Sequence, residues 1–265
     1  MQVKEVRFKY SRPDIFQIIP FGDLHLGTVH CCEDEIQKKV KQIQNTENCY
    51  FVGMGDYMEC ITPKDPRWDG SGIAGWVHDD NIAYDQTNRL CEILAPIKDK
   101  CLGLLEGNHE DAIKKHNHDN VQRVICEKLG VTNLGYSCFI KFIFIRSKSH
   151  NEQYIGYFTH GAGCAVTAGA KLTRLQRTMD NFEADIIAHA HVHDVLTYVK
   201  PYLMLNSANQ VKSRVKVAAM TGCYFRTYTQ GESSSYGEIK SYPPTTLGSP
   251  TFTIIPDKGI LKVNN

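Results

Sequence analysis

Five short polar segments of the chain carry the side chains that could do chemistry. They contain aspartates, histidines and an asparagine, whose oxygen and imidazole donors suit divalent metal ions. In chain order these residues are Asp23 and His25 in DLH, Asp56 in GD, Asn108 and His109 in GNHE, His160 in THG, and His191 and His193 in AHVH. A pair of divalent ions can activate a water and hold a phosphate. The series therefore predicts hydrolysis of a phosphate ester.

Short apolar runs precede most of these segments and read as strands. The runs are Phe16–Phe21, Tyr50–Met54, Leu102–Leu105 and Asp185–Ala188. Side chains just beyond the carboxyl ends of parallel strands converge on one crevice. We therefore expect the polar segments to meet at one point although they lie far apart in sequence.

Helical patterns alternate with the strands. Ile36, Val40 and Ile43 recur at helical spacing within 33–46, and further helices are expected within 81–94, 121–129 and 166–179. The apolar stretches SCFIKFIFIR and QYIGYFTH read as strands of a second sheet. This alternation predicts an α/β (α+β) protein.

Composition limits the classes to which the protein can belong but does not identify a partner. The 265 residues carry a formal net charge of +1, made of −5 over residues 1–140 and +6 over the remainder. This asymmetry is too modest to indicate a nucleic-acid-binding protein. The charged N-terminus does not resemble a signal peptide, and no apolar stretch is long enough for a membrane helix, so we expect a cytoplasmic protein with no membrane partner. The ten scattered cysteines favour buried thiols over disulfides.

A lone DxH or GD is usually a turn or a helix cap. Taken together and in order, the segments resemble the calcineurin-like metallophosphoesterase superfamily, whose pattern is DxH, GDxxD, GNH followed by Asp or Glu, a single His, and GHxH. The match runs from about Ile18 to Asp194. It implies a four-layer fold in which two mixed β-sheets pack as a sandwich flanked by helices.

Three positions depart from the family pattern. Glu59 occupies the second acidic position, and Cys60 stands where the protein serine/threonine phosphatases carry Arg. Ala190 replaces the usual glycine before His191.

The resemblance implies a role for each of the seven candidate ligands. Asp23, His25 and His193 would bind the first metal, and Asn108, His160 and His191 the second, with Asp56 bridging both. Ions roughly 3.5 to 4 Å apart can hold a hydroxide that attacks phosphorus in line with the leaving oxygen. Manganese is the expected metal, and Fe, Zn, Ni and Co suit the same donors.

His109 is expected to act on the leaving group, because its neighbour Asn108 takes the coordinating position. Glu59 is the expected partner of its ring, with Glu110 as the alternative. In HAHVH, His189 and His191 could be the ligand pair, but alignment on the family form favours His191 and His193.

Basic residues suggest the class of substrate. Lys171, Arg174 and Arg177 recur three apart in the helix expected at 166–179 and are the predicted substrate-binding residues, and VKSRVKV forms a second basic stripe. A solvated surface explains either stripe alone. With the missing Arg at position 60, they favour phosphodiesters in DNA, RNA or a nucleotide over monoesters. The alternatives are a phosphomonoesterase and a non-catalytic metal-bound scaffold.

Two segments are expected to surround the site. The loop ITPKDPRWDGSGIAGWVHDD, rich in Gly and Pro, could form a wall over the substrate or pack onto the surface. We place the catalytic domain at residues 1–221, and a Tyr/Ser/Gly/Pro-rich extension at 222–265 that packs on the same domain.

Overall fold

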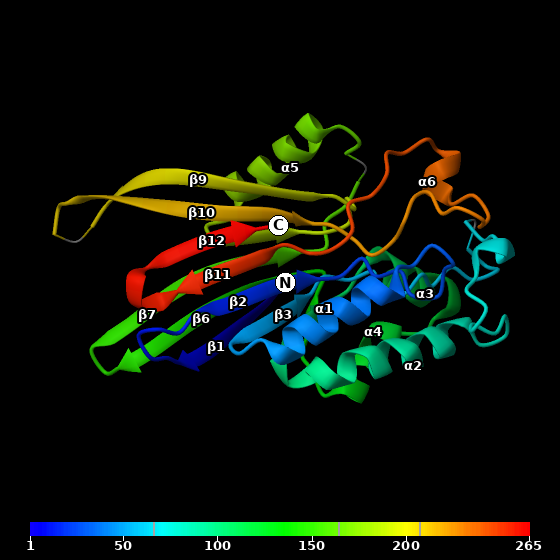
Figure 1. The fold of residues 1–265 in the computed structure, drawn as a ribbon, viewed down its shortest axis with the longest axis horizontal. Coiled ribbons are helices and arrows are strands. Elements are labelled where there is room, and N and C mark those ends of the chain that lie inside the picture. The colour runs from blue at the N-terminus through cyan, green and yellow to red at the C-terminus, as the bar shows by residue number, and fades with distance from the viewer. Residues whose placement is uncertain (66, 164, 207) are drawn as a thin grey trace.

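The structure is a computed structural model and describes residues 1–65, 67–163, 165–206 and 208–265. Within these ranges two six-stranded sheets pack face to face (Figure 1). Each sheet combines parallel and antiparallel neighbours. The predicted fold class, two mixed sheets in a sandwich flanked by helices, is therefore confirmed.

The first sheet contains the long strands of the second half of the chain. Its order is β1 (Gln2–Lys9), β6 (Ser137–Ser147), β7 (His150–Thr159), β8 (Ile186–His189), β10 (Val211–Thr221) and β9 (Val195–Leu205). The strands β7, β8 and β10 run parallel, which directs the residues that follow them to the same end of the sheet.

The second sheet contains the three strands that precede the first polar segments. Its order is β12 (Ile260–Asn264), β11 (Thr251–Ile255), β2 (Phe16–Phe21), β3 (Cys49–Gly53), β4 (Cys101–Leu105) and β5 (Asn133–Gly135). Strands β2, β3 and β4 are parallel, and β11 pairs antiparallel with β2. The C-terminal residues thus complete this sheet.

Helices cover the outer face of each sheet. On the second sheet lie α1 (Glu33–Asn45), α2 (Ile82–Leu94) and α4 (Val121–Leu129), and on the first lies α5 (Ala168–Asn181). Ile36, Val40 and Ile43 are buried, as their helical spacing predicted. The helices α3 (Asn108–Asn117) and α6 (Tyr236–Ile239) lie at the end of the sandwich where the strand-to-helix loops gather (Figure 1).

Aromatic and branched side chains fill the space between the sheets. Phe16 and Phe252 of one sheet, and Phe142 and Phe144 of the other, belong to one buried cluster. Each such side chain contributes about 1.5 to 3 kcal/mol of transfer free energy when it is fully buried. This core holds the two sheets, and the loops at their ends, in a fixed relation.

Two further observations concern the cysteines and the helices of the described residues. Nine cysteines are described, all as free thiols, and most are buried, whereas Cys164 lies outside the described residues. No helix in the described ranges is long and apolar enough to span a membrane.

Candidate metal centre

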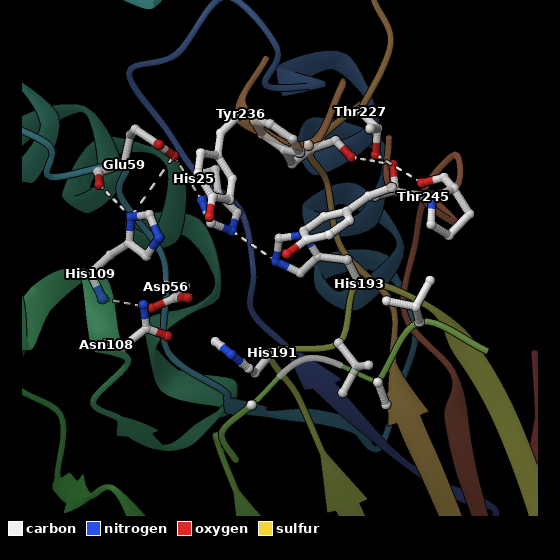
Figure 2. A pocket seen from close by; sticks show the side chains of 18 of the residues that line it. His25, Asp56, Glu59, Asn108, His109, His191, His193, Thr227, Tyr236 and Thr245 are labelled. Carbon is white, nitrogen blue, oxygen red and sulfur yellow. Dashed lines mark hydrogen bonds and ion pairs between the residues drawn. The ribbon is translucent and has the colours of Figure 1, made fainter. Parts of the chain in front are cut away.

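The polar segments converge at one end of the sandwich. Asp23, Asp56 and Asn108 follow β2, β3 and β4 of the second sheet, and His160 and His191 follow β7 and β8 of the first. Because the two sheets pack face to face, these strand ends meet across the sandwich (Figure 2). Donors separated by as much as 168 positions along the chain come within hydrogen-bonding distance.

One group of donors consists of Asp23, His25 and His193, whose ligand atoms lie within 4.8 Å of one another. The Nε2 atoms of His25 and His193 are 3.0 Å apart, and Asp23 Oδ1 is 3.3 Å from His193 Nε2. Asp23 is fully buried.

A second group consists of Asp56, His160 and His191, within the same 4.8 Å limit. His160 Nε2 lies 3.3 Å from Asp56 Oδ2 and 3.0 Å from Asn108 Oδ1. Asp56 also lies within 4.8 Å of ligand atoms of His25, so its carboxylate reaches toward both groups. The arrangement leaves one carboxylate between two donor sets.

Hydrogen bonds fix which ring nitrogen faces the centre. His160 Nδ1 donates to the carbonyl of Met54 at 2.8 Å, and His25 Nδ1 contacts Glu59 Oε2 at 2.8 Å. With the proton on Nδ1, the Nε2 lone pair of each neutral ring points inward. Anchoring the outer nitrogen in this way is how proteins orient histidine ligands.

Unpartnered buried atoms test whether the site suits metal ions. Asp23 Oδ1 and His191 Nδ1 are both buried without a hydrogen-bond partner in the described residues, although His193 Nε2 lies within ion-pair distance of the former. A buried polar atom without a partner costs about 1 to 3 kcal/mol. Such atoms, together with inward-facing lone pairs, fit a pair of divalent cations.

The pKa values reflect the same concentration of acceptors. Burial would lower the pKa of His160, but the negative charges of Asp56 and Asp23 and the hydrogen bonds to Asp56 and Met54 together raise it to about 9. Burial and the charge of His160 lower the pKa of His191 to about 4. Without an ion, a proton on His160 therefore offsets the buried carboxylate, while His191 keeps a free lone pair.

Strained backbone coincides with the candidate ligands. Five of the seven have left-handed φ angles between 49° and 72°, namely Asp23, His25, Asp56, His191 and His193. This conformation costs a non-glycine residue about 1 to 3 kcal/mol and clusters at functional sites. The left-handed conformations lower stability locally, and they direct these side chains toward one point.

Gly107 and the buried carboxylate of Glu110 pack closely against the backbone at Asp56. A Cβ at Gly107 would lie 2.1 Å from Asp56 Oδ1, so the loops approach too closely for a side chain. Glu110 accepts hydrogen bonds from the backbone N–H groups of Asp56, Tyr57 and Gly107 at 2.8 to 3.0 Å. Glu110 thereby joins the loop after β3 to the start of α3 and does not orient His109.

His109 lies beside the metal groups, with one ring nitrogen directed into a cavity. Its Nδ1 donates to the backbone carbonyl of Glu59, which leaves Nε2 facing the cavity (Figure 2). The expected partner was the Glu59 carboxylate, but Oε2 lies 3.9 Å from His109 Nδ1 and 2.8 Å from His25 Nδ1. Glu59 therefore orients His109 through its main chain and His25 through its side chain.

His189 is the last residue of β8 and lies outside both donor groups. Its Nδ1 is 3.5 Å from Thr178 Oγ1, and its Nε2 packs against Gly161, where a Cβ would lie 2.2 Å away. The structure thus brings His191 and His193, rather than His189, to the centre.

A cavity of about 420 Å³ opens beside the donor groups and defines where a substrate would lie. We call it the central cavity. Five of the candidate ligands, His25, Asp56, Asn108, His191 and His193, line it together with His109 (Figure 2). The C-terminal segment completes the lining with residues that include Phe225, Thr227, Tyr236, Pro243 and Thr245. Mostly apolar walls with a few polar groups are typical of small-molecule sites.

The three predicted substrate-binding residues do not act as one surface. Lys171 is buried, lines the central cavity and pairs with Asp194 at 2.9 Å. Arg174 and Arg177 instead line a neighbouring groove along α5. A helix turns by about 100° per residue, so side chains three apart drift around its axis.

Phe225 and Arg67 are among the lining residues that were not predicted from the sequence. Phe225 packs in a tilted orientation against two candidate ligands, with its ring centroid 5.3 Å from that of His25 and 6.0 Å from that of His193. Arg67 reaches the cavity from the loop after β3, and Nη1 lies 3.4 Å from His109 Nε2. The Gly- and Pro-rich composition marked that loop as a candidate wall, but nothing in it singled out Arg67.

Comparisons with known proteins add little to this geometry. No protein-family model and no curated protein matches the chain. A crystal structure of a conserved uncharacterised protein from Streptococcus pneumoniae TIGR4, described as a predicted phosphoesterase, aligns with 91% of this chain and 84% of its own. The identity is 11% and the TM-score is 0.34, so the function rests on the site itself.

Proposed function

We propose that the protein hydrolyses phosphate esters with two divalent metal ions, preferring phosphodiesters. The observation that carries the proposal is the convergence of inward-facing acceptors, shown by His160 Nε2 at 3.0 Å from Asn108 Oδ1 and 3.3 Å from Asp56 Oδ2. Without a metal ion, a proton on His160 holds these atoms together, and a divalent cation bound between them would take the place of that proton. Five of the seven candidate ligands also line the central cavity, namely His25, Asp56, Asn108, His191 and His193.

Each donor group would hold one ion. Asp23, His25 and His193 would hold the first, and His160 and His191, with the oxygen of Asn108, the second. The carboxylate of Asp56, which lies near both groups, suits a bridging position. When bound, two divalent cations lower the pKa of coordinated water and stabilise charge on phosphoryl oxygens.

His109 is placed to protonate the leaving oxygen. Burial and the positive charge of Arg67 would lower its pKa, but the negative charges of Asp56 and Glu59 raise the pKa above the ordinary histidine value. Because Nδ1 is held by the carbonyl of Glu59, Nε2 is the atom that would donate into the cavity. A general acid in this position contributes roughly 10² to 10⁴ in rate.

The charges of the cavity lining support a diester over a monoester. Two cationic side chains line the cavity in the described residues, and each is paired, Arg67 with Asp65 and Lys171 with Asp194. The lining therefore adds little net positive charge, which suits the single charge of a diester better than the two of a monoester. A nucleotide, or the end of a single DNA or RNA strand, fits the volume of about 420 Å³.

A substrate panel tests the proposal. We would add Mn²⁺ and compare bis-p-nitrophenyl phosphate, p-nitrophenyl phosphate, a cyclic nucleotide, and single- and double-stranded DNA. We expect turnover of the diesters, loss of turnover after EDTA treatment, and recovery when Mn²⁺ is restored. The Asp56→Asn variant, purified in parallel, controls for contaminating phosphatases, because it should bind less metal and turn over no ester.

Two results would contradict the proposal. If the wild type retains no divalent metal and cleaves none of these esters, the chemistry is wrong. If p-nitrophenyl phosphate turns over much faster than the diester, the enzyme is a phosphomonoesterase.

A further inference from the structure

Arg67 lies in a loop with its own small core. The loop between β3 and α2 buries Ala74 and Val77 with Ile82, and Trp68, which follows Arg67, packs against them. The backbone of the loop is also tied to the first polar segment, through hydrogen bonds from Val29 N to Gly72 O and from Ala74 N to Gly27 O. The loop is therefore held in place by its own packing and by backbone hydrogen bonds where it lines the cavity.

Asp65 fixes the guanidinium of Arg67. Nε and Nη2 of Arg67 donate to the two carboxylate oxygens of Asp65 at 3.0 and 2.8 Å, and the backbone N–H of Arg67 donates to the same carboxylate at 2.9 Å. The Asp65 side chain is only 4% exposed. A bidentate pair of this kind removes most of the rotational freedom of arginine.

The pairing leaves one guanidinium nitrogen directed at the reaction site. Nη1 of Arg67 donates to His109 Nε2 at 3.4 Å on the cavity side, and an oxygen of a bound phosphate would take the place of this acceptor. Among the described residues that line the cavity, the other cation is Lys171, held by Asp194. Arg67 is thus the cation placed beside the proposed proton donor.

We propose that Nη1 of Arg67 donates a hydrogen bond to a non-bridging oxygen of the substrate phosphate, and that Asp65 is its positioning residue. This inference rests on the proposed function and names the phosphate anchor of that site. An arginine held this way selects for a tetrahedral oxyanion near His109, because its donor direction is set before the substrate arrives. The side chain of Arg67 remains 35% exposed, so it is accessible to an entering anion.

Binding of inorganic phosphate measures the anchor separately from turnover. We would titrate phosphate by calorimetry into Mn²⁺-loaded wild type, Arg67→Ala, Arg67→Gln and Asp65→Asn, with metal content and melting temperature recorded for each. We expect Arg67→Ala and Arg67→Gln to bind phosphate roughly 10- to 100-fold more weakly with both ions retained, the range for a lost charged hydrogen bond. The matched control is Arg89→Ala, which removes an arginine of α2 that pairs with Glu33 of α1. This variant should bind phosphate as the wild type does.

A double-mutant cycle isolates the role of Asp65. If Asp65 acts through Arg67, Asp65→Asn should weaken phosphate binding in the wild type but cause no further loss in Arg67→Ala. The same variants should raise KM for the diester in the same order.

The outcomes separate this inference from the function on which it rests. Wild-type affinity for phosphate in Arg67→Ala and Arg67→Gln, or loss of a metal ion from both, overturns the anchor while leaving the phosphoesterase intact. Additive losses for Asp65→Asn and Arg67→Ala overturn the positioning role of Asp65. A wild type that binds neither metal nor phosphate overturns the proposed function, and the anchor with it.

Discussion

The carboxylate of Glu59 holds His25, since Oε2 lies 2.8 Å from His25 Nδ1. Burial would raise the pKa of Glu59, but the nearby His109 and His25 lower it to about 2, so the group stays ionised. An ionised carboxylate behind a histidine makes the opposite ring nitrogen a better ligand. Glu59 thus supports the candidate metal site through His25, and its main chain also orients His109.

Glu59→Gln should therefore weaken metal binding more than it slows the chemistry. We expect affinity for one Mn²⁺ to fall roughly 10- to 100-fold, the usual effect of losing such a partner. Calorimetric titration of Mn²⁺ into the metal-free protein measures this. Glu127→Gln, on the exposed face of α4, is the control. Unchanged metal affinity combined with reduced turnover would assign Glu59 to His109 instead.

His109→Ala should separate catalysis from metal binding. Removing the proposed proton donor should lower kcat roughly 10²- to 10⁴-fold, while elemental analysis still finds two ions per chain. The loss should be smaller for a substrate with a good leaving group such as p-nitrophenol, which needs less protonation. An emptied metal site in this variant would show that His109 is a ligand. Its ligand atoms lie within 4.8 Å of those of His25 and Asp56, so the experiment can distinguish the two roles.

Gly107→Ala should disturb the centre through the backbone. The new Cβ would lie 2.1 Å from Asp56 Oδ1 and 2.2 Å from Asp56 N, so the loop must move. We expect a loss of about 1 to 3 kcal/mol in the free energy of unfolding, measured in urea, together with lower Mn²⁺ retention. Gly75→Ala is matched, because its Cβ would meet nothing within 4 Å. Equal stability for both variants would refute the packing argument.

Deprotonation of buried thiols should lower the stability of the folded protein at alkaline pH. Burial raises the pKa of Cys138 from 9.0 to about 12. The unfolded chain therefore loses this proton at lower pH than the folded protein does, so stability is unaffected below pH 9 and falls between pH 9 and 12. The contribution is about 1.4 kcal/mol per pH unit.

Cys138→Ala should flatten that decline, although it lowers stability at neutral pH by creating a cavity. Urea unfolding at pH 8, 9, 10 and 11 measures the difference from the wild type. Ile140→Val, in the same strand and core, should be destabilised equally at every pH. A wild-type slope in Cys138→Ala would mean that the thiol does not titrate as its burial requires.

Periodic and apolar segments could be predicted from sequence because their signal is local. The strand Phe16–Phe21 and the helix Val121–Leu129 have the predicted limits, since a continuous apolar run and helical burial are both visible in the residues themselves. The helix α3, by contrast, was not predicted. It is short and largely polar, and its early residues are fixed by the Glu110 contacts rather than by an apolar stripe.

Side-chain partners could not be predicted with the same success. Glu59 was expected to reach His109, yet its carboxylate turns to His25, and Arg67 approaches His109 from a loop without periodic structure. Lys171, Arg174 and Arg177 recur three apart in sequence, but the packing of α5 buries the first against Asp194 and sends the others to a separate groove.

The sequence by itself determined which donors are available and that strands deliver them to a common edge, because residue type and strand periodicity are properties of neighbouring positions. The tertiary structure alone decided which atoms face one another. Those contacts depend on how two sheets and two irregular segments pack, and distances between residues as far apart as His25 and His193 are set by the whole core rather than by any local stretch.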